Sequence, residues 1–257
     1  MIKMNSNFSF FKGKWDVLAN LGVTAENNVF QDPHTTIMKL RLFAETLTKF
    51  VLAAENIIEA YGTTQIDRIN TLRREGLLEQ ELIDIFEVLR KKGNIAMHEA
   101  GYGNTEEAKA LLQLTFRLSV WFMEVYGDWD FQAPEYIVPK EDEVVDTNQL
   151  QQEYEEKLKK FEEELVKARH SAEKEEDKAK SERKRKSKTF MRRQHLTEAE
   201  TRTIIDEKLR AAGWEVDTTV LNHQKNGTLP EKNRNMAIAE WKVDGGRVDY
   251  ALFIGLR

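Results

Sequence analysis

The sequence predicts a mainly α-helical protein that ends in the beginning of an α/β unit. Through most of residues 1–140, apolar residues recur at three- and four-residue steps, which places them on one face of a helix. Residues 141–194 have no glycine or proline and are densely charged. Residues 195–257 combine one helical pattern with apolar runs on either side of a Gly-Gly pair, as strands and turns do. We therefore expect an all-α helical bundle, a charged helical arm or linker, and an incomplete α/β domain, in that order.

The helices of the first region follow from their apolar periodicity. We expect the longest over Thr35–Tyr61, and another over Thr105–Tyr126 with Asn104 or Thr105 as its N-cap. Shorter segments with the same helical periodicity cover Lys14–Leu21, Gln65–Glu75 and Glu79–Lys91. This bundle is expected to end near Pro134–Pro139.

The charged segment is expected to form one long, mostly solvated helix. Its narrow apolar stripe is too short to establish a coiled coil, and it consists of Leu150, Tyr154, Leu158, Phe161 and Leu165. Residues 141–177 carry 14 acidic and 6 basic residues, whereas 178–193 carry 9 basic and 1 acidic. The basic part could contact a phosphate backbone, or it could be a solvated face that the acidic part neutralises. The candidate nucleic-acid contacts are Arg183, Lys184, Arg185, Lys186, Arg192 and Arg193.

The last region begins with a helix, LTEAETRTIIDEKLRAAG, in which Thr197 and Glu200 form a capping box and Gly213 marks the end. Strands are expected at WEVDTTVL, NMAIAEWKV and RVDYALFIG, with a Gly245-Gly246 turn between the last two. Asp249 stands at the start of an otherwise apolar strand, which costs free energy unless a partner such as a metal ion compensates. The alternative is a surface aspartate beside the turn.

Composition excludes several classes of site. The chain has no cysteine, so it forms no disulfide, thiolate nucleophile or Cys-ligated zinc site. Its five histidines lack metal-binding spacing, and no phosphate-cradling Gly-rich loop for ATP is present. No apolar run has membrane-spanning length, and the start does not resemble a signal peptide. We expect a cytoplasmic protein without a membrane partner.

LTEAETRTIIDEKLRAAGWEVD, NMAIAEW and GGRVDYALFIG resemble the N-terminal nuclease region of type I restriction R subunits, which belongs to the PD-(D/E)XK superfamily with its restriction-endonuclease-like fold. The resemblance implies that Asp249 is the first catalytic, Mg²⁺-binding aspartate, with a helix glutamate, Glu200 or less well Glu198, assisting. It also implies DNA and the modification and specificity subunits as partners, with ATP used by downstream domains. The family's Glu-x-Lys strand does not follow Asp249 within these residues, so we expect this chain to be inactive alone.

The first region resembles the HEPN class of helical bundles, on the residues SNFSFF, QDPHTTIMKLRLFAETL and RKKGNIAMHEAGYG. That class can cut RNA through an Arg-Asn-x-x-x-His motif. Asn94 and His98 match it, but Gly93 stands at the arginine position. We expect a structural or nucleic-acid-contacting role here, with Arg90, Lys91 and Lys92 near phosphate. The rival functions are a non-catalytic interaction module and a HEPN-like ribonuclease.

Overall fold

The computed structural model describes residues 6–141, 148–173, 177–193 and 195–255, with backbone alone for 148–160 and 177. The described residues divide into two compact units between His195 and Leu196. The first is helical, and the second combines helices with a small sheet. The mainly α fold class with a small α/β element is confirmed.

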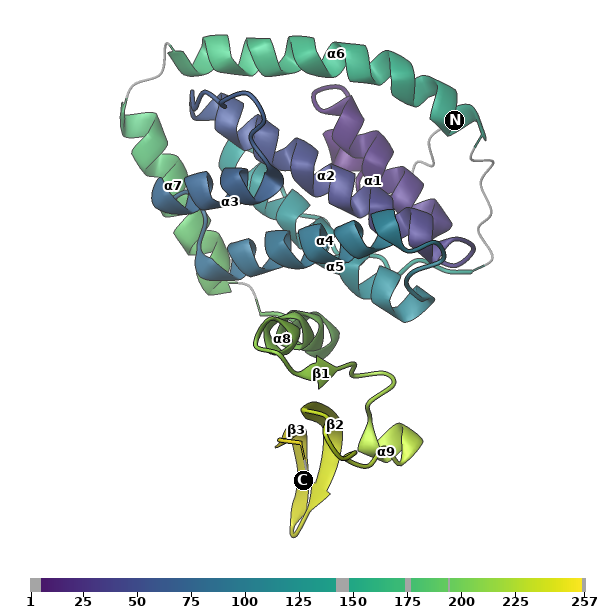
Figure 1. Cartoon of the computed structure of the whole chain (residues 1–257). Helices are drawn as coiled ribbons and strands as arrows, with labels where there is room; N and C mark the ends of the chain where they lie inside the picture. Colours follow the sequence, from purple (N-terminus) through teal and green to yellow (C-terminus); the bar gives the residue numbers. More distant parts are fainter. Residues whose placement is uncertain (1–5, 142–147, 174–176, 194, 256–257) are drawn as a thin grey trace. The chain divides into compact units, whose positions relative to one another are not determined.

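The helical unit contains a short 3-10 helix at Ser9–Phe11 and seven α-helices within its described residues (Figure 1). They are α1 (Asp16–Asn28), α2 (Pro33–Ala54), α3 (Gln65–Arg74), α4 (Gln80–His98), α5 (Thr105–Tyr126), α6 (Asn148–Glu173) and α7 (Asp177–Arg193). As expected, the Asn104 side chain caps α5 by accepting a hydrogen bond from the backbone N–H of Glu107 at 2.9 Å. Asp32 caps α2 in the same way, before a proline at the first helical turn.

Aromatic side chains from α2, α5 and the chain before α1 form the centre of the bundle. Phe8, Phe11 and Phe43 are fully buried. Their ring centroids lie 5.6 to 5.8 Å apart for the Phe8–Phe43 and Phe11–Phe43 pairs, with edge-to-face geometry. Such pairs add to the free energy of apolar burial, so Phe8 and Phe11, which lie before α1, belong to the core.

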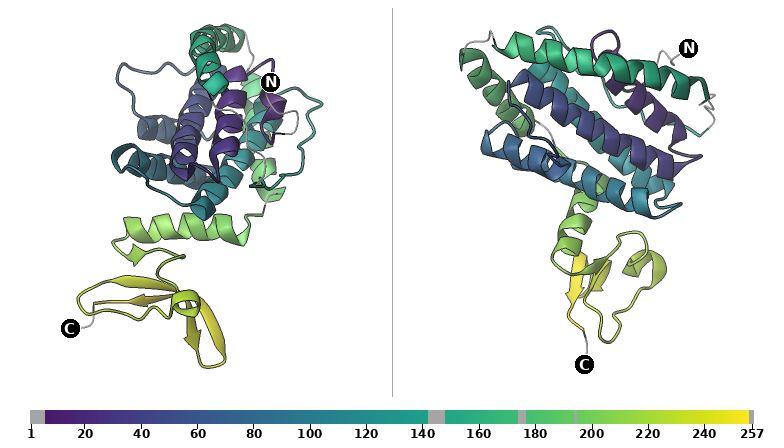
Figure 2. Two further views of the ribbon diagram at one scale, coloured as in Figure 1. Left: turned by 90° about the vertical axis from the view of Figure 1, so that its right-hand side faces the viewer. Right: turned by 45° about the horizontal axis from the view of Figure 1, so that its top comes forward.

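The charged segment forms two helices in place of the one expected, and both pack on the bundle. Figures 1 and 2 show α6 running along α2 and α1, and Phe161 on α6 contacts Phe50 on α2 with ring centroids 5.1 Å apart. On α7, Phe190 is fully buried. Buried Ser187 donates to the Leu77 carbonyl and accepts from the Trp121 indole. The stripe residues Leu150, Tyr154 and Leu158 lie outside the described side chains.

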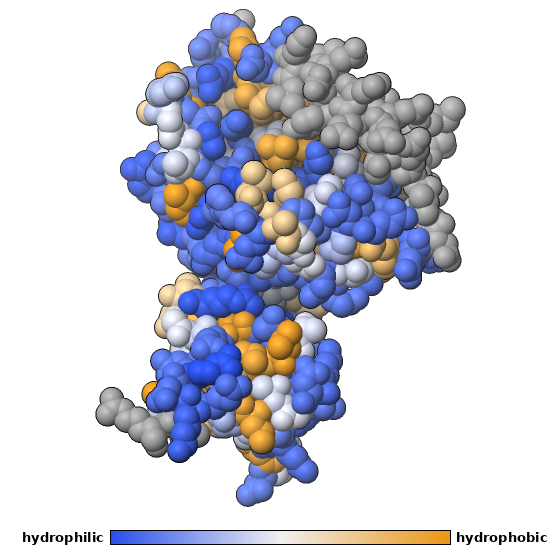
Figure 3. All heavy atoms as spheres, turned by 45° about the vertical axis from the view of Figure 1, so that its right-hand side comes forward, coloured by the Kyte–Doolittle hydropathy of each residue, from blue (hydrophilic) through white to orange (hydrophobic). Residues whose placement is uncertain are grey.

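The second unit contains α8 (Glu198–Ala211), β1 (Glu215–Val216), α9 (His223–Asn226), β2 (Met236–Val243) and β3 (Gly246–Phe253). β2 lies between the other two strands, parallel to β1 and antiparallel to β3. The first four residues of β2, Met236 to Ala239, are fully buried and form the centre of the small core. On the face drawn in Figure 3, hydrophobic residues gather in small patches among hydrophilic ones.

Two expected elements are shorter in the structure, whereas the helices expected at Lys14–Leu21 and Glu79–Lys91 extend to Asn28 and His98. The helix expected to reach Tyr61 ends at Ala54, and Asn56 takes the left-handed backbone conformation. Ile58 and Tyr61, which fit the helical periodicity, are exposed. The WEVDTTVL strand reduces to Glu215–Val216, because Asp217 accepts hydrogen bonds from the backbone N–H groups of Thr219 and Val220 and turns the chain.

Candidate functional site

Asp249 lies in the middle of β3, and 87% of its side chain is exposed. The hairpin that carries it forms as the sequence predicts, with Val243 pairing Gly246 across a tight turn. Gly245 in that turn has a φ of 91°, which a residue with a side chain rarely adopts. The turn sets the register of the hairpin and therefore decides which β2 residue faces Asp249.

That residue is Glu240. Ala239 pairs with Tyr250 and Trp241 pairs with Val248, so Glu240 and Asp249 occupy opposite positions between these pairs. Glu240 is not itself a paired position, and its φ is 53°. A non-glycine residue in the left-handed region inside a strand is costly, and such residues cluster at functional sites. The sequence analysis missed Glu240, although a charged residue inside the run MAIAEW was the available signal.

Arg202 on α8 joins the two carboxylates. Its guanidinium pairs closely with Glu240 and lies 3.6 Å from the Asp249 carboxylate. The side chains of Arg202 and Glu240 are 14% and 17% exposed, so this ion pair is largely shielded from water. Arg247 reaches Glu240 from the other side at 3.4 Å. One helix and two strands thus bring two carboxylates and two arginines together.

Burial and the neighbouring carboxylates together determine the pKa of Arg202. Burial alone lowers its pKa, but the hydrogen bond to Glu198 and the charge of Glu240 outweigh burial, so the pKa of Arg202 is raised. The guanidinium therefore remains charged. It restrains Asp249 through a fixed positive charge, and the exposed carboxylate stays accessible to a further cation.

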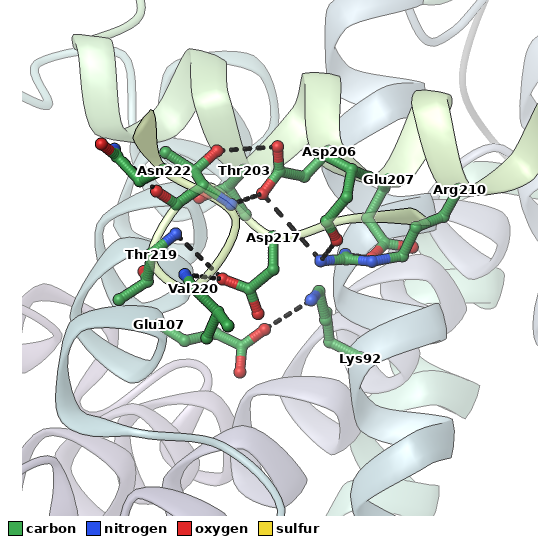
Figure 4. A network of polar contacts seen from close by, with 12 residues as sticks. Lys92, Glu107, Thr203, Asp206, Glu207, Arg210, Asp217, Thr219, Val220 and Asn222 are labelled. Atoms are coloured by element: carbon green, nitrogen blue, oxygen red, sulfur yellow. Dashed lines mark hydrogen bonds and ion pairs between the residues drawn. The ribbon is translucent and has the colours of Figure 1, made fainter. Parts of the chain in front are cut away.

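A hydrogen-bonded network holds α8 onto the sheet below this cluster. Asp206 on α8 is buried and accepts from the Tyr250 hydroxyl at 2.7 Å, and from the Thr218 backbone and hydroxyl at 3.0 and 2.8 Å. Burial, followed by this hydrogen bond to Asp206, raises the pKa of Tyr250. Arg210 lies 3.9 Å from Asp206 and also pairs with Glu207, as Figure 4 shows. The network positions α8, and hence Arg202, against β3.

The two helix glutamates named from the sequence have different surroundings. Glu200 is fully buried and accepts a hydrogen bond from the Thr197 backbone at 2.7 Å, so the expected capping box is confirmed. Glu198 is exposed and lies 3.0 Å from Arg202. The arginine therefore connects Glu198, and not the capping Glu200, to the cluster around Asp249.

This cluster contains two carboxylates, and carboxylate oxygens are the ligands that a hard cation prefers. Asp249 and Glu240 present carboxylate oxygens, the ligands that Mg²⁺ prefers. Within the described ranges, no group of three or more His, Cys, Asp and Glu side chains is arranged to hold a metal ion. Glu240 is already paired with Arg202 and Arg247, so Asp249 is the carboxylate of this pair that is left accessible to a cation.

Residues of the second unit match a known protein family. The family described as type I restriction enzyme EcoKI endonuclease subunit second domain matches residues 215–257. The EcoKI endonuclease subunit of Escherichia coli strain K12 is 31% identical over 306 aligned residues, which include 98% of this chain. The chain is related to the N-terminal region of type I restriction R subunits. It spans about a quarter of that relative's length, 26%, and no solved structure gave a significant match.

The family match covers β1 to β3 and includes both Glu240 and Asp249. Arg202 and the rest of α8 lie before the matched segment, within the longer alignment to the R subunit. The cluster therefore combines Glu240 and Asp249, which lie inside the matched segment, with Arg202, which lies before it.

The candidate nucleic-acid contacts on α7 divide between two surroundings. Arg183 is nearly buried and its Nε donates to Glu55 at 2.6 Å, so it packs α7 onto the bundle. Lys184 and Lys186 are half-buried, while Arg185 and Arg192 are exposed. Arg193 pairs with Glu124 on α5. Of the six candidates, Arg185 and Arg192 are the most accessible to a phosphate backbone.

The HEPN-like residues occupy the end of α4. Asn94 is half-buried and His98 is exposed. Gly93 packs so closely on the Arg41 side chain that an added Cβ would lie 2.3 Å from it. Lys92, expected near phosphate, is buried instead, with its Nζ 2.5 Å from Glu107 and 3.1 Å from the Tyr102 hydroxyl. Close packing against Arg41 therefore explains the glycine at position 93. Lys92 serves in a buried ion pair with Glu107 and does not face solvent.

No helix within the part of the chain that the structure describes is long and apolar enough to cross a membrane.

Proposed function

We propose that this chain is the N-terminal part of a type I restriction R subunit, and that Asp249 supplies its first carboxylate ligand for Mg²⁺-dependent DNA cleavage. The observation that carries the proposal is the position of Asp249. It is an exposed carboxylate inside the segment that matches the R-subunit family, opposite a second carboxylate and restrained by Arg202. The proposal covers a piece of the R subunit, and the remaining ligands come from the Glu-x-Lys strand that the resemblance implies.

Bound Mg²⁺ supplies an activated water and shields the charge that develops on the scissile phosphate. The residues of this chain orient the carboxylate. Arg202 opposes free rotation of Asp249 by ion pairing at 3.6 Å, and Glu240 holds Arg202 in place. Asp206 and Tyr250 fix the helix that carries Arg202 relative to β3. Together they pre-organise one ligand before the metal ion binds.

The wider assignment follows the same resemblance. In the proposal, the R subunit acts on DNA in the cytoplasm as part of a restriction-modification complex for phage defence. The modification and specificity subunits are its partners, and ATP is used by domains outside these 257 residues. No Glu-x-Lys pair follows Asp249 in this chain, so the isolated chain is expected to leave supercoiled plasmid uncut with Mg²⁺ and ATP.

The test is Asp249→Ala in the complete R subunit, assembled with its partner subunits. Loss of a metal ligand should remove several kcal/mol of transition-state stabilisation and lower the cleavage rate by roughly a thousandfold. DNA-stimulated ATP hydrolysis should stay near the wild-type rate, because the substitution removes an exposed side chain with little packing. The matched control is Asp244→Asn, which changes a carboxylate in the turn of the same hairpin. Cleavage at the wild-type rate by Asp249→Ala would refute the assignment.

Arg202→Gln separates positioning from metal ligation. If Arg202 orients Asp249, this variant should lower the cleavage rate by about tenfold and change the Mg²⁺ concentration for half-maximal cleavage. Circular dichroism and ATPase activity report whether the protein is still folded. An unchanged Mg²⁺ dependence would show that Arg202 serves only to pack α8 on the sheet.

A further inference from the structure

A groove of about 670 Å³ lies on the helical unit, between the end of α5 and one face of α7. Residues from the segment 128–133, which follows α5, form one side of it. Side chains from successive turns of α7 form the other side, and they are Arg185, Lys186, Thr189 and Arg193. All of the lining residues belong to the helical unit, so the groove is separate from the Asp249 cluster.

Trp129 is exposed on a turn that its neighbours hold in place. The backbone N–H of Phe131 donates to the Asp128 carbonyl at 3.1 Å and closes the turn. Lys14 pairs with the Asp128 carboxylate at 3.1 Å, and the Phe131 ring meets Phe10 edge to face with ring centroids 5.4 Å apart. Trp129 itself is 94% exposed, so it adds little to the core. A large apolar ring is costly to leave in water, and tryptophan is enriched at binding interfaces, so this side chain is a candidate contact for a ligand.

Positive charge without a partner lies in the same groove as Trp129. One of the two carboxylates in the lining is engaged by Lys14, and the other, Glu124, pairs with Arg193. Arg185 is exposed and Lys186 is half-buried, and neither has an ion pair among the described residues. The groove therefore combines an exposed indole with two cations that are available to an anion.

We propose that this groove binds single-stranded DNA, with a base stacked on Trp129 and backbone phosphates at Arg185 and Lys186. Proteins that bind single strands combine a cationic groove along the backbone with aromatic side chains that stack on bases. Residues 178–193 carry 9 basic residues and 1 acidic residue, and the acidic one lies outside the lining. The positive charge therefore continues along the helix beyond the groove, as a long polyanion requires.

The indole determines which form of DNA fits. A base in a duplex is covered on both faces by its neighbours, whereas a base in a single strand can leave the stack and lie on Trp129. Cations alone would bind either form through its phosphates. The choice of DNA over RNA rests on the function proposed above for the R subunit, and RNA is therefore included in the test.

Fluorescence anisotropy of the 257-residue chain with an oligothymidylate of about 15 nucleotides, and with a duplex of the same length, tests the proposal. The single strand should bind about tenfold more tightly, because it alone offers both base and phosphate contacts. Binding of the single strand should also quench tryptophan fluorescence. An oligouridylate of equal length is the RNA comparison, and tighter binding of RNA than of DNA would contradict the assignment to DNA.

Variants of the indole separate stacking from charge. Trp129→Leu should weaken single-strand binding by about tenfold and remove most of the quenching, while duplex binding stays near the wild-type affinity. Trp129→Phe keeps an aromatic ring and should retain most of the single-strand affinity. The matched control is Tyr61→Leu, since Tyr61 is another fully exposed aromatic residue of the helical unit, and it should leave both affinities unchanged.

Variants of the cations test the phosphate contacts. Arg185→Gln combined with Lys186→Gln should weaken binding of both DNA forms and lower the log–log salt slope for the single strand by about 1 to 1.5, because each phosphate contact contributes about 0.7. Lys12→Gln with Lys140→Gln makes the same charge change at exposed positions outside the lining and should leave the slope unchanged.

Three results would overturn the proposal: no binding of the single strand, equal affinity for single strand and duplex, or unchanged single-strand affinity in Trp129→Leu. All three are read from binding by the 257-residue chain. The assignment of Asp249 is read from cleavage by the complete R subunit, so either proposal can fail while the other stands.

Discussion

In the helical unit, buried charges are used to pack one helix on another, whereas in the α/β unit buried charges gather around an exposed carboxylate. Arg183 pairs with Glu55 and Lys92 pairs with Glu107, each fastening neighbouring parts of the bundle. In the α/β unit, Arg202 pairs with Glu240 and also reaches Asp249, whose side chain is 87% exposed. The same residue types therefore serve different ends in the two units.

The difference shows what distinguishes a structural ion pair from a candidate site. A structural pair satisfies both partners and leaves nothing for a ligand, as with Arg183 and Glu55. The α/β cluster leaves one carboxylate facing solvent and includes a residue with a φ of 53°, which must be stabilised by its surroundings. Exposure of one member and backbone strain in another are the features that the packing pairs lack.

The largest expected effect concerns the Arg183–Glu55 pair. Arg183→Gln leaves the Glu55 carboxylate, whose side chain is 3% exposed, without its cation, and removing one partner of a buried pair costs about 3–5 kcal/mol. Arg185→Gln, two residues along the same helix and exposed, should change the free energy of unfolding by no more than about 0.5 kcal/mol. Urea unfolding followed by circular dichroism measures both. Equal effects would show that α7 does not depend on this pair.

A smaller effect is expected in the α/β unit. Asp206→Ala removes the acceptor for the Thr218 backbone, the Thr218 hydroxyl and the Tyr250 hydroxyl, and donors left unsatisfied in this way cost about 1–3 kcal/mol. Hydrogen exchange should therefore become faster at the amides of β2 and β3, while those of α2 and α5 keep their protection. Asp217→Ala is a useful comparison, because its hydrogen bonds stabilise only a local turn. Faster exchange throughout both units would contradict this separation.

The smallest effect concerns three cations of α7, of which Arg185 and Arg192 are exposed and Lys184 is half-buried. Replacing Lys184, Arg185 and Arg192 with Gln should weaken non-specific DNA binding and reduce the log–log salt slope by about 2 to 3, because each phosphate contact contributes about 0.9. Fluorescence anisotropy over a range of salt concentrations measures the slope. The control replaces an equal number of exposed cations elsewhere on the helical unit, at Lys12, Arg74 and Lys140. If both sets change the slope equally, α7 is not a specific DNA-contacting face.

Local signals in the sequence determined many of the elements. The α5 boundaries, the Thr197–Glu200 capping box and the hairpin around Gly245 follow from capping residues, periodicity and turn glycines, because these preferences act within a few residues. The relationship to R subunits also rests on sequence, through the residues around Asp249. The function of Asp249 as a metal ligand is still a prediction.

Tertiary structure determines which charged side chains are held in ion pairs and which face solvent. Arg183 and Arg185 are alike in sequence, yet one faces Glu55 and the other faces solvent, because the position of α7 on the bundle depends on the burial of Ser187 and Phe190. Glu240 becomes part of the candidate site through the register of β2 and β3, and Arg202 through the packing of α8. Contacts between residues 38 or 128 positions apart depend on how whole elements pack, and no local pattern encodes them.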